Sequence, residues 1–380
     1  MAATAAEPLA VAGTSGIPGS AERSLLVDAD VHPLIRDTSV LAPRMSRRVA
    51  RRIFGSHVGT FARDPNRIPH PSSGLRLDAL PPSGGPAGCD PAFAREQWLD
   101  PYDVNAAVLI PVQSGVVIPW GDERASQEFI SAFNDYLLDD WHGLDARYRV
   151  TISVTPHDPA AAIREVERLA GVDGVVAIFV PHASVSLGRR QWWPLYELAA
   201  DRGLPIVVHP TGAESNLVDA PWVAGGLPRN YPERHSLLLH PGQSMLSSLV
   251  FSGVFDAVPS LKVVLSEYGF SWVPALTMRM DDAWEKGDRE LAGIERAPSD
   301  YVRESVRFTT QPLDEPADRR DLWRLLELMD ADRTLLFSSD YPHWDTDDPD
   351  VILRTRLPHH LRDRIAWQSA VDVFGPRLGL

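Results

Sequence analysis

The chain is poor in two reactive residue types, cysteine and lysine. Its 380 residues include one cysteine, Cys89, and only two of the 37 basic residues are lysines, Lys262 and Lys286. One thiol excludes an internal disulfide, a zinc site of several thiolates and an iron–sulfur cluster held by this chain alone. Any metal site in the chain must therefore be built from histidine and carboxylate side chains.

Long apolar runs and net positive charge are also lacking. No run approaches the roughly 20 apolar residues that a membrane-spanning helix needs. Residues 1–20 are rich in Ala, Gly, Ser and Pro and lack the basic start and apolar stretch of a secretion signal. We therefore expect a disordered tail over 1–23 on a cytoplasmic protein. The net charge of −14 argues against nucleic acid or an anionic membrane as a partner.

Eight apolar runs of strand length alternate with helical stretches, as in repeated βα units. The runs lie at 25–30, 106–111, 149–154, 174–180, 204–209, 261–267, 306–310 and 334–340. The helices between and after them are expected at about 122–146, 159–170, 191–202, 243–258, 271–290, 318–329 and 350–374. This alternation predicts a single (β/α)8 TIM barrel over 24–380, with its chemistry at the C-terminal ends of the strands.

A long segment, 33–100, separates the first two predicted strands. Its part 62–92 is dense in Pro, Gly and Ser, and loops of this length are usually functional or disordered. We interpret 33–100 as an insertion that forms a partly ordered lid over the mouth of the barrel. Its first half carries a stripe of arginines at mixed helical spacing, namely Arg44, Arg47, Arg48, Arg51 and Arg52.

Metal-binding residue types stand where four of the predicted strands end. Asp30 and His32 end the first strand, His209 the fifth, Glu267 the sixth and Asp340 the eighth. Residues two apart in a strand share a face, so Asp30 and His32 can point into the same mouth. A lone histidine before proline, such as His209, is more often structural. Together, however, Asp30, His32, His209 and Asp340 predict a metal site of nitrogen and oxygen ligands.

Further histidines leave open whether there is a second metal. His235 and His240 precede the sixth strand, His182 follows the fourth, and His343 follows Asp340 by three residues. On one interpretation these are surface histidines or neighbours of the site. On the other, Glu267 and His240 hold a second metal ion, with His235, His182 and His343 as weaker candidates.

Four motifs resemble the amidohydrolase-related metalloenzyme family. They are 27–33 (VDADVHP), 207–210 (VVHP), 266–272 (SEYGFSW) and 337–344 (FSSDYPHW). The resemblance implies a distorted TIM barrel with Asp30, His32, His209 and Asp340 as ligands of zinc or manganese, in a hydrolase or a non-oxidative decarboxylase. The chain departs from the family by having Asp30 where a histidine is common. It also has Glu267 where decarboxylases related to aminocarboxymuconate semialdehyde decarboxylase carry a catalytic histidine.

The scarcity of lysine narrows the binuclear alternatives. Many binuclear hydrolases of this superfamily bridge their metals with a carboxylated lysine on the fourth strand, and neither lysine lies there. A shell of histidine and carboxylate alone is typical of nonheme iron. The runs 338–345 and 307–312 also resemble a branch of nonheme diiron monooxygenases typified by platensimycin and platencin biosynthesis.

We therefore expect a monooxygenase with two Fe ions, with Glu267, His240 and Asp340 as its catalytic residues. It would hydroxylate a substrate linked to coenzyme A and receive electrons from an external reductase. The alternatives are a hydrolase or non-oxidative decarboxylase with one Zn or Mn ion, and an inactive barrel that acts as a binding protein. Barrels of this family are often dimers, so the resemblance also implies a homodimer.

Substrate contacts are the least specific predictions. Arg47 and Arg51 could bind the phosphates of a coenzyme A carrier, although a solvated helix face or an acidic partner surface explains them slightly better. Trp120, Trp222 and Trp344 fall in loops after strands and are expected to line an apolar substrate pocket. No glycine-rich phosphate loop follows a strand, which argues against bound NAD or flavin.

Overall fold

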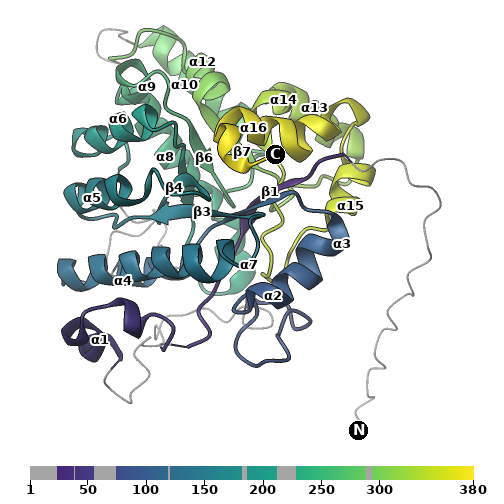
Figure 1. Cartoon of the computed structure of the whole chain (residues 1–380). Helices are drawn as coiled ribbons and strands as arrows, with labels where there is room; N and C mark the ends of the chain where they lie inside the picture. Colours follow the sequence, from purple (N-terminus) through teal and green to yellow (C-terminus); the bar gives the residue numbers. More distant parts are fainter. Residues whose placement is uncertain are drawn as a thin grey trace, which may run out of the picture.

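The computed structural model describes residues 24–37, 39–54, 74–118, 120–181, 186–211, 228–287 and 293–380. The predicted tail, 1–23, lies outside this part of the chain. The described residues form an α/β barrel with helices around the strands, and the predicted TIM barrel is confirmed (Figure 1).

Eight parallel strands pair in the order in which they occur along the chain. They are β1 (Val27–Val31), β2 (Ala106–Leu109), β3 (Tyr148–Ser153), β4 (Val175–Pro181), β5 (Ile206–His209), β6 (Val263–Leu265), β7 (Val306–Thr309) and β8 (Leu335–Leu336). Each observed strand overlaps a predicted one. The main difference is length, since β6 and β8 end before Glu267 and Asp340, which therefore lie in the loops that follow.

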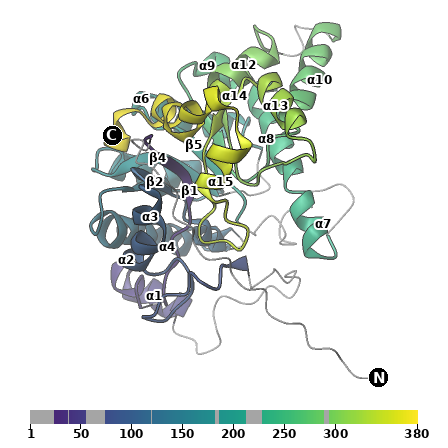
Figure 2. The ribbon, with the colours of Figure 1, turned by 90° about the vertical axis from the view of Figure 1, so that its right-hand side faces the viewer.

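The larger helices around the strands are α4 (Glu123–Tyr136), α5 (Pro159–Leu169), α6 (Trp193–Asp201), α8 (Leu239–Phe251), α10 (Val273–Lys286), α12 (Pro298–Ser305), α13 (Arg319–Leu328) and α16 (Ser369–Phe374). Shorter helical segments are η1 (Ala42–Arg44), α1 (Arg47–Phe54), α2 (Pro91–Ala94), η3 (Arg95–Leu99), α3 (Asp100–Tyr102), η4 (Val112–Val117), η5 (Leu137–His142), η6 (Arg190–Trp192), α7 (Tyr231–Ser236), α9 (Val254–Ala257), α14 (Ala331–Thr334), α15 (Pro349–Val351), η8 (Ile352–Arg356), η9 (His359–Leu361), η10 (Arg364–Gln368) and η11 (Gly375–Leu378). In the two views α1, α2 and α7 lie in the lower half and α9, α12 and α14 in the upper half (Figures 1 and 2).

Two predicted helices are interrupted for local reasons. The helix expected at 243–258 divides into α8 and α9 at Gly253, whose φ of 75° belongs to the left-handed region that glycine adopts without strain. The helix expected at 350–374 is a series of short segments, because Pro358 lacks the N–H that a continuous helix needs.

Two apolar clusters hold the barrel together. The smaller one gathers residues such as Val27, Val108, Phe179 and Val207 with Phe374 from α16. The larger one packs the opposite faces of the strands against the surrounding helices. Strand residues thus alternate between two buried environments, which is why most strands read as continuous apolar runs.

The barrel closes where β8 meets β1. Three backbone hydrogen bonds join the strands, from Ala29 N to Phe337 O (3.0 Å), from Asp340 N to Asp30 O (3.1 Å) and from His32 N to Tyr341 O (2.8 Å). Because β8 itself has two residues, most of this closure is made by the segment that follows it.

The described end of the predicted insertion lies against the barrel wall. Trp98 of η3 stacks on Tyr341, with ring centroids 5.1 Å apart, and donates a hydrogen bond to Asp28 of β1. Residues 55–73, at the centre of the predicted lid, lie outside the described residues, so a lid stays a prediction. No helix among the described residues is long and apolar enough to cross a lipid bilayer.

Candidate metal centre

Four predicted ligands meet at the C-terminal ends of the strands. Asp30 and His32 come from the end of β1, His209 from the end of β5 and Asp340 from the loop after β8. All four side chains are buried, and one ligand atom of each lies within 4.8 Å of the other three. The fold therefore assembles a set of two imidazoles and two carboxylates that could hold a metal ion.

The two imidazoles turn the same type of nitrogen toward the carboxylates. Nε2 of His32 lies 2.6 Å from Oδ1 of Asp340 and 3.2 Å from Oδ1 of Asp30, and Nε2 of His209 lies 3.1 Å from Oδ2 of Asp30. The other nitrogen, Nδ1, faces a backbone carbonyl, that of Ile110 for His32 (2.9 Å) and that of Pro210 for His209 (2.5 Å). A carbonyl only accepts, so Nδ1 carries the hydrogen in both rings, as in metal-binding histidines.

The polar atoms at the centre of the cluster fit a cation. Oδ1 of Asp30, Oδ2 of Asp340 and Nε2 of His209 are buried and have no hydrogen-bond partner among the residues that the structure describes. Burial alone would lower the pKa of His32, but the carboxylates of Asp30 and Asp340 outweigh it and raise the pKa to about 9. The cluster thus needs positive charge, which a divalent ion supplies by displacing the proton from the imidazole.

Glu267 lies beside the four ligands. Its Oε2 is 3.2 Å from Nε2 of His209, and its backbone has a φ of 61° and donates to Oγ1 of Thr309 (3.1 Å). Burial, together with the charges of Asp340 and Asp345, raises the pKa of Glu267 well above its usual range. The site therefore contains a third acidic group, beside Asp30 and Asp340, that favours its protonated form.

The other predicted metal ligands do not form a second centre. His240 is exposed in the first turn of α8, because Pro241 and Gly242 beside it are the residues buried there. His235 pairs with Asp345, with 3.2 Å between Nε2 and Oδ2. The prediction that His240 and Glu267 share a metal ion is therefore wrong, and Asp30, His32, His209 and Asp340 form the one such group found among the residues that the structure describes. His182 lies outside them.

His343 is close to the cluster in another role. Its Nδ1 lies 2.5 Å from Oδ1 of Asp340, and its ring stands 4.5 Å from the ring of His32. It contacts a ligand of the cluster rather than joining it, and its side chain is 25% exposed.

The predicted substrate residues lie in different places. Trp344 is near the cluster, since it follows Asp340 closely and donates from Nε1 to the hydroxyl of Tyr231 on α7 (2.9 Å). Arg47 and Arg51 are exposed on α1. Trp222 lies outside the described residues.

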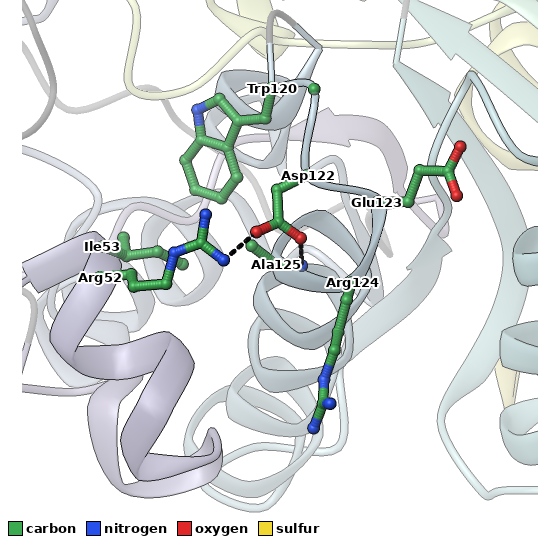
Figure 3. Close-up of a pocket in the computed structure, with 8 residues that line it drawn as sticks. Arg52, Ile53, Trp120, Asp122, Glu123, Arg124 and Ala125 are labelled. Carbon is green, nitrogen blue, oxygen red and sulfur yellow. Dashed lines mark hydrogen bonds and ion pairs between the residues drawn. The ribbon is translucent and has the colours of Figure 1, made fainter.

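Trp120 lines a separate pocket of about 810 Å³ between the end of α1 and the start of α4 (Figure 3). Arg52 points toward the ring of Trp120 and forms an ion pair with Asp122. The pocket's lining residues include none of the four ligands. A contact between Trp120 and a substrate at the metal centre therefore stays a prediction.

Two contacts to the cluster were missed by sequence reasoning. Ser266, at the end of β6, donates from Oγ to Oδ2 of Asp30 (2.5 Å). Asp28 of β1 bonds to the segment that carries Asp340. The available signal was a polar residue inside an otherwise apolar strand, at Asp28 and again at Ser266 directly before Glu267.

Comparison with known proteins places this geometry in context. Residues 27–375 match the family model described as amidohydrolase. A gamma-resorcylate decarboxylase of Polaromonas sp. (strain JS666 / ATCC BAA-500) is 26% identical over 74% of this chain and 86% of its own length. Among solved structures, an amidohydrolase of Mycobacterium avium subsp. paratuberculosis has a TM-score of 0.70 and 22% identity, covering 93% of this chain and 100% of the other. A dihydroxybenzoic acid decarboxylase of Polaromonas, with bound manganese and the inhibitor 2-nitroresorcinol, has a TM-score of 0.60 and 19% identity, covering 93% of this chain and 97% of the other.

These findings correct the functional prediction. The expected monooxygenase and its two Fe ions are wrong, because two of the three named relatives are decarboxylases, one of them with manganese, and the described residues form one four-ligand group. The resemblance to the amidohydrolase family as a whole is confirmed, whereas the diiron branch of that resemblance is not supported. The motif around Asp340 therefore indicates the amidohydrolase family and its barrel fold, and it does not indicate oxygen chemistry.

Proposed function

Because this chain belongs to the amidohydrolase family, we propose that it is a non-oxidative decarboxylase that uses one divalent metal ion, Mn²⁺ or Zn²⁺. We further propose that its substrate is an aromatic carboxylic acid with a hydroxyl group next to the carboxylate. The gamma-resorcylate decarboxylases support this substrate class, since the matched region spans 86% of the length of one and 76% of the other.

One observation carries the proposal, namely a buried four-ligand cluster with a protonatable acid beside it. Asp30, His32, His209 and Asp340 would hold the metal, and Glu267 stands 3.2 Å from His209. A metal bound there supplies a Lewis acid that anchors carboxylate and phenolate oxygens. Glu267, a third acid that stays out of the ligand set, is then available for proton transfer.

Loss of carbon dioxide requires a proton donor. When the bond between the ring carbon and the carboxylate breaks, carbon dioxide leaves and its bonding electron pair remains on the ring carbon. A proton must then form the new C–H bond at that carbon. Glu267 occupies the position at which the resemblance implies a catalytic histidine in related decarboxylases, so its carboxyl group is placed to deliver this proton.

The surrounding residues keep Glu267 in place and limit water. Its N–H is held by Thr309, and the neighbouring Ser266 bonds to Asp30, so the β6 end is tied to the ligand cluster at two points. The ligand side chains themselves have no exposed surface. A buried site of this kind strengthens the interaction of its fixed charges with a bound acid.

The test is decarboxylation by metal-loaded protein. Purified chain is stripped with a chelator and reloaded with Mn²⁺, Zn²⁺ or Fe²⁺, and carbon dioxide release is measured from hydroxybenzoates, including 2,6-dihydroxybenzoate. We expect one Mn²⁺ or Zn²⁺ per chain to restore activity and 2-nitroresorcinol to inhibit it. Protein that binds the metal and releases no carbon dioxide from any hydroxybenzoate would overturn the proposal. Hydrolysis of an ester or amide panel by the same protein would point instead to a hydrolase with Glu267 as general base.

A further inference from the structure

Asp28 is a fully buried carboxylate that binds hydrogen-bond donors from three segments of the chain. Its Oδ1 accepts the N–H of Asp30 (3.3 Å) and the N–H of Ser339 (3.0 Å). Its Oδ2 accepts the hydroxyl of Ser339 (2.6 Å) and Nε1–H of Trp98 (2.8 Å). An acidic group without solvent is costly unless such donors surround it, so this residue needs an explanation beyond packing.

The position of Asp28 explains these bonds. β8 ends after two residues and most backbone bonds to β1 come from the segment after it, so regular strand pairing is short where the barrel closes. The N–H of Ser339 donates to the side chain of Asp28 instead of to a backbone carbonyl of β1. Asp28 therefore replaces missing sheet hydrogen bonds with a side chain.

The same bonds connect the two aspartates of the metal centre. Ser339 directly precedes Asp340, and its hydroxyl also accepts the N–H of Tyr341 (3.0 Å), so the turn around Asp340 is held on both sides. Asp340 has a φ of 64°, a conformation that a non-glycine residue keeps only when its surroundings enforce it. On the other strand, Asp28 binds the N–H of Asp30 itself.

Trp98 adds the third segment. It belongs to η3 at the end of the insertion, donates to Asp28 and stacks on Tyr341 at 18° between the ring planes. Burial raises the pKa of Asp28 to about 6, whereas the hydrogen bonds from Ser339, Trp98 and Asp30 lower it.

We propose that Asp28 is a positioning residue of the metal centre. It sets the spacing of Asp30 and Asp340 by joining β1, the Ser339–Tyr341 turn and Trp98 at the closure of the barrel. It touches neither metal nor substrate in this role. Metal affinity, and not only folding, should then depend on it, as it does for residues that orient metal ligands from behind.

The test measures Mn²⁺ binding to chelator-treated full-length protein, by calorimetry or from the spectroscopic signal of free Mn²⁺. Asp28→Asn keeps an oxygen for the two backbone donors but turns an amide toward Trp98 and the hydroxyl of Ser339. Ser339→Ala removes the hydroxyl and leaves the carboxylate. We expect Mn²⁺ affinity to fall by about 10- to 100-fold in Asp28→Asn and by a smaller factor in Ser339→Ala.

Glu165 on α5 provides a matched control. It is also buried, and it accepts hydrogen bonds from Ser131 (2.8 Å), Asn134 (2.8 Å) and Arg168 (2.6 Å). None of these partners contacts a metal ligand in the described bonds. Glu165→Gln should lower the melting temperature as Asp28→Asn does while leaving Mn²⁺ affinity unchanged.

The outcomes separate positioning from a purely structural role. Mn²⁺ affinity within twofold of the wild type in folded Asp28→Asn and Ser339→Ala would overturn the proposal, as would equal weakening by Glu165→Gln. If Asp28→Asn does not fold, Ser339→Ala and Trp98→Phe, which keeps the stack on Tyr341, decide the matter by the same criterion. Wild-type protein that binds Mn²⁺ and releases no carbon dioxide would defeat the proposed function and leave this proposal standing.

Discussion

The hydrogen bonding of polar groups differs between the two ends of the barrel. At the C-terminal end, three buried ligand atoms of Asp30, His209 and Asp340 lack a hydrogen-bond partner in the described part of the chain. At the N-terminal end, cationic side chains donate to backbone carbonyls. Arg377, for example, donates to the carbonyls of Ala170 (3.1 Å), Val175 (3.2 Å) and Arg202 (3.0 Å).

The carbonyls bound at the N-terminal end belong largely to helix C-termini. Ala170 and Arg202 lie at the C-terminal ends of α5 and α6. At the end of α12, Lys262 donates to the carbonyl of Glu304 (2.7 Å) and Arg307 donates to that of Val306 (2.8 Å). A cation there donates to a backbone carbonyl and complements the negative end of the helix dipole. The hydrogen bonds at the N-terminal end therefore contribute to stability, whereas the C-terminal end has unsatisfied groups that are available to bind a ligand.

The largest effect should follow from removing a ligand at the C-terminal end. Asp340→Asn takes away one charged oxygen donor and the partner of His32, so decarboxylation should fall by about 10³-fold, equivalent to several kcal/mol of lost transition-state stabilisation. Excess Mn²⁺ should raise the unfolding free energy of the wild type by about 2.7 kcal/mol at a hundred times Kd, and that of the variant hardly at all. Metal content and melting curves with and without Mn²⁺ check both statements.

A surface acid serves as the control for this ligand. Asp321→Asn, exposed on α13, changes the net charge by the same amount. Its Mn²⁺-dependent stabilisation should match the wild type. An Asp340→Asn variant that retains full activity would remove Asp340 from the site and end the contrast between the two ends.

The sequence predicted the C-terminal end better than the N-terminal end. Asp30, His32, His209 and Asp340 could be found because each follows an apolar run, and a parallel barrel brings all such strand ends together. His240 could not be judged, because its exposure depends on which face of α8 packs against the barrel. Asp28 was hidden for a similar reason, since its partners Trp98 and Ser339 come from segments that only the folded barrel brings beside β1.

The cationic end was not predicted at all. The scarcity of lysine drew attention to arginine, but a sequence does not reveal which arginine reaches the end of which helix. Lys262 and Arg377 act on carbonyls that only the folded barrel brings within reach, 42 positions away for Lys262 and Glu304 and 207 for Arg377 and Ala170. The fold class follows from local patterns, whereas these contacts follow from tertiary packing.

At the N-terminal end, Arg377→Met should lower stability without affecting the metal. The variant keeps an apolar stem but leaves three carbonyls without their donor, and we expect the free energy of unfolding to fall by about 2 kcal/mol. Denaturant unfolding of metal-free protein measures the change. Arg320→Met, which removes an exposed ion pair with Asp318, should leave the free energy of unfolding unchanged. A loss of Mn²⁺ affinity in Arg377→Met would show that the two ends are coupled.

A smaller, pH-dependent effect should arise from Asp347, which lies beyond the metal ligand Asp340. Burial, and next the charges of Asp345 and Asp340, raise its pKa to about 7. Since the unfolded chain releases this proton near pH 4, the folded state binds the extra proton between about pH 4 and 7, and stability should fall as pH rises through that window. Asp347→Asn should reduce this fall by about 1–2 kcal/mol.

The pH effect is measured by denaturant unfolding of metal-free protein at pH 5 and at pH 8. The difference between wild type and variant isolates Asp347 from other titrating groups. Asp321→Asn should leave the pH dependence unchanged. A variant that loses as much stability as the wild type between the two pH values would show that Asp347 is already ionised at pH 5.

The smallest effect should come from the contact between α7 and the loop after β8. The hydroxyl of Tyr231 accepts the Trp344 indole hydrogen at 2.9 Å, and His235 pairs with Asp345 one residue further along. Tyr231→Phe removes this acceptor, but Trp344 is 40% exposed, so water can replace it and stability should fall by less than about 1 kcal/mol. Because Trp344 lies in the loop that carries Asp340, KM for the aromatic acid should rise by a few-fold while kcat and Mn²⁺ affinity stay constant. A change in kcat with unaltered KM would instead assign this contact to the chemistry of the metal centre, and the C-terminal end would then extend to α7.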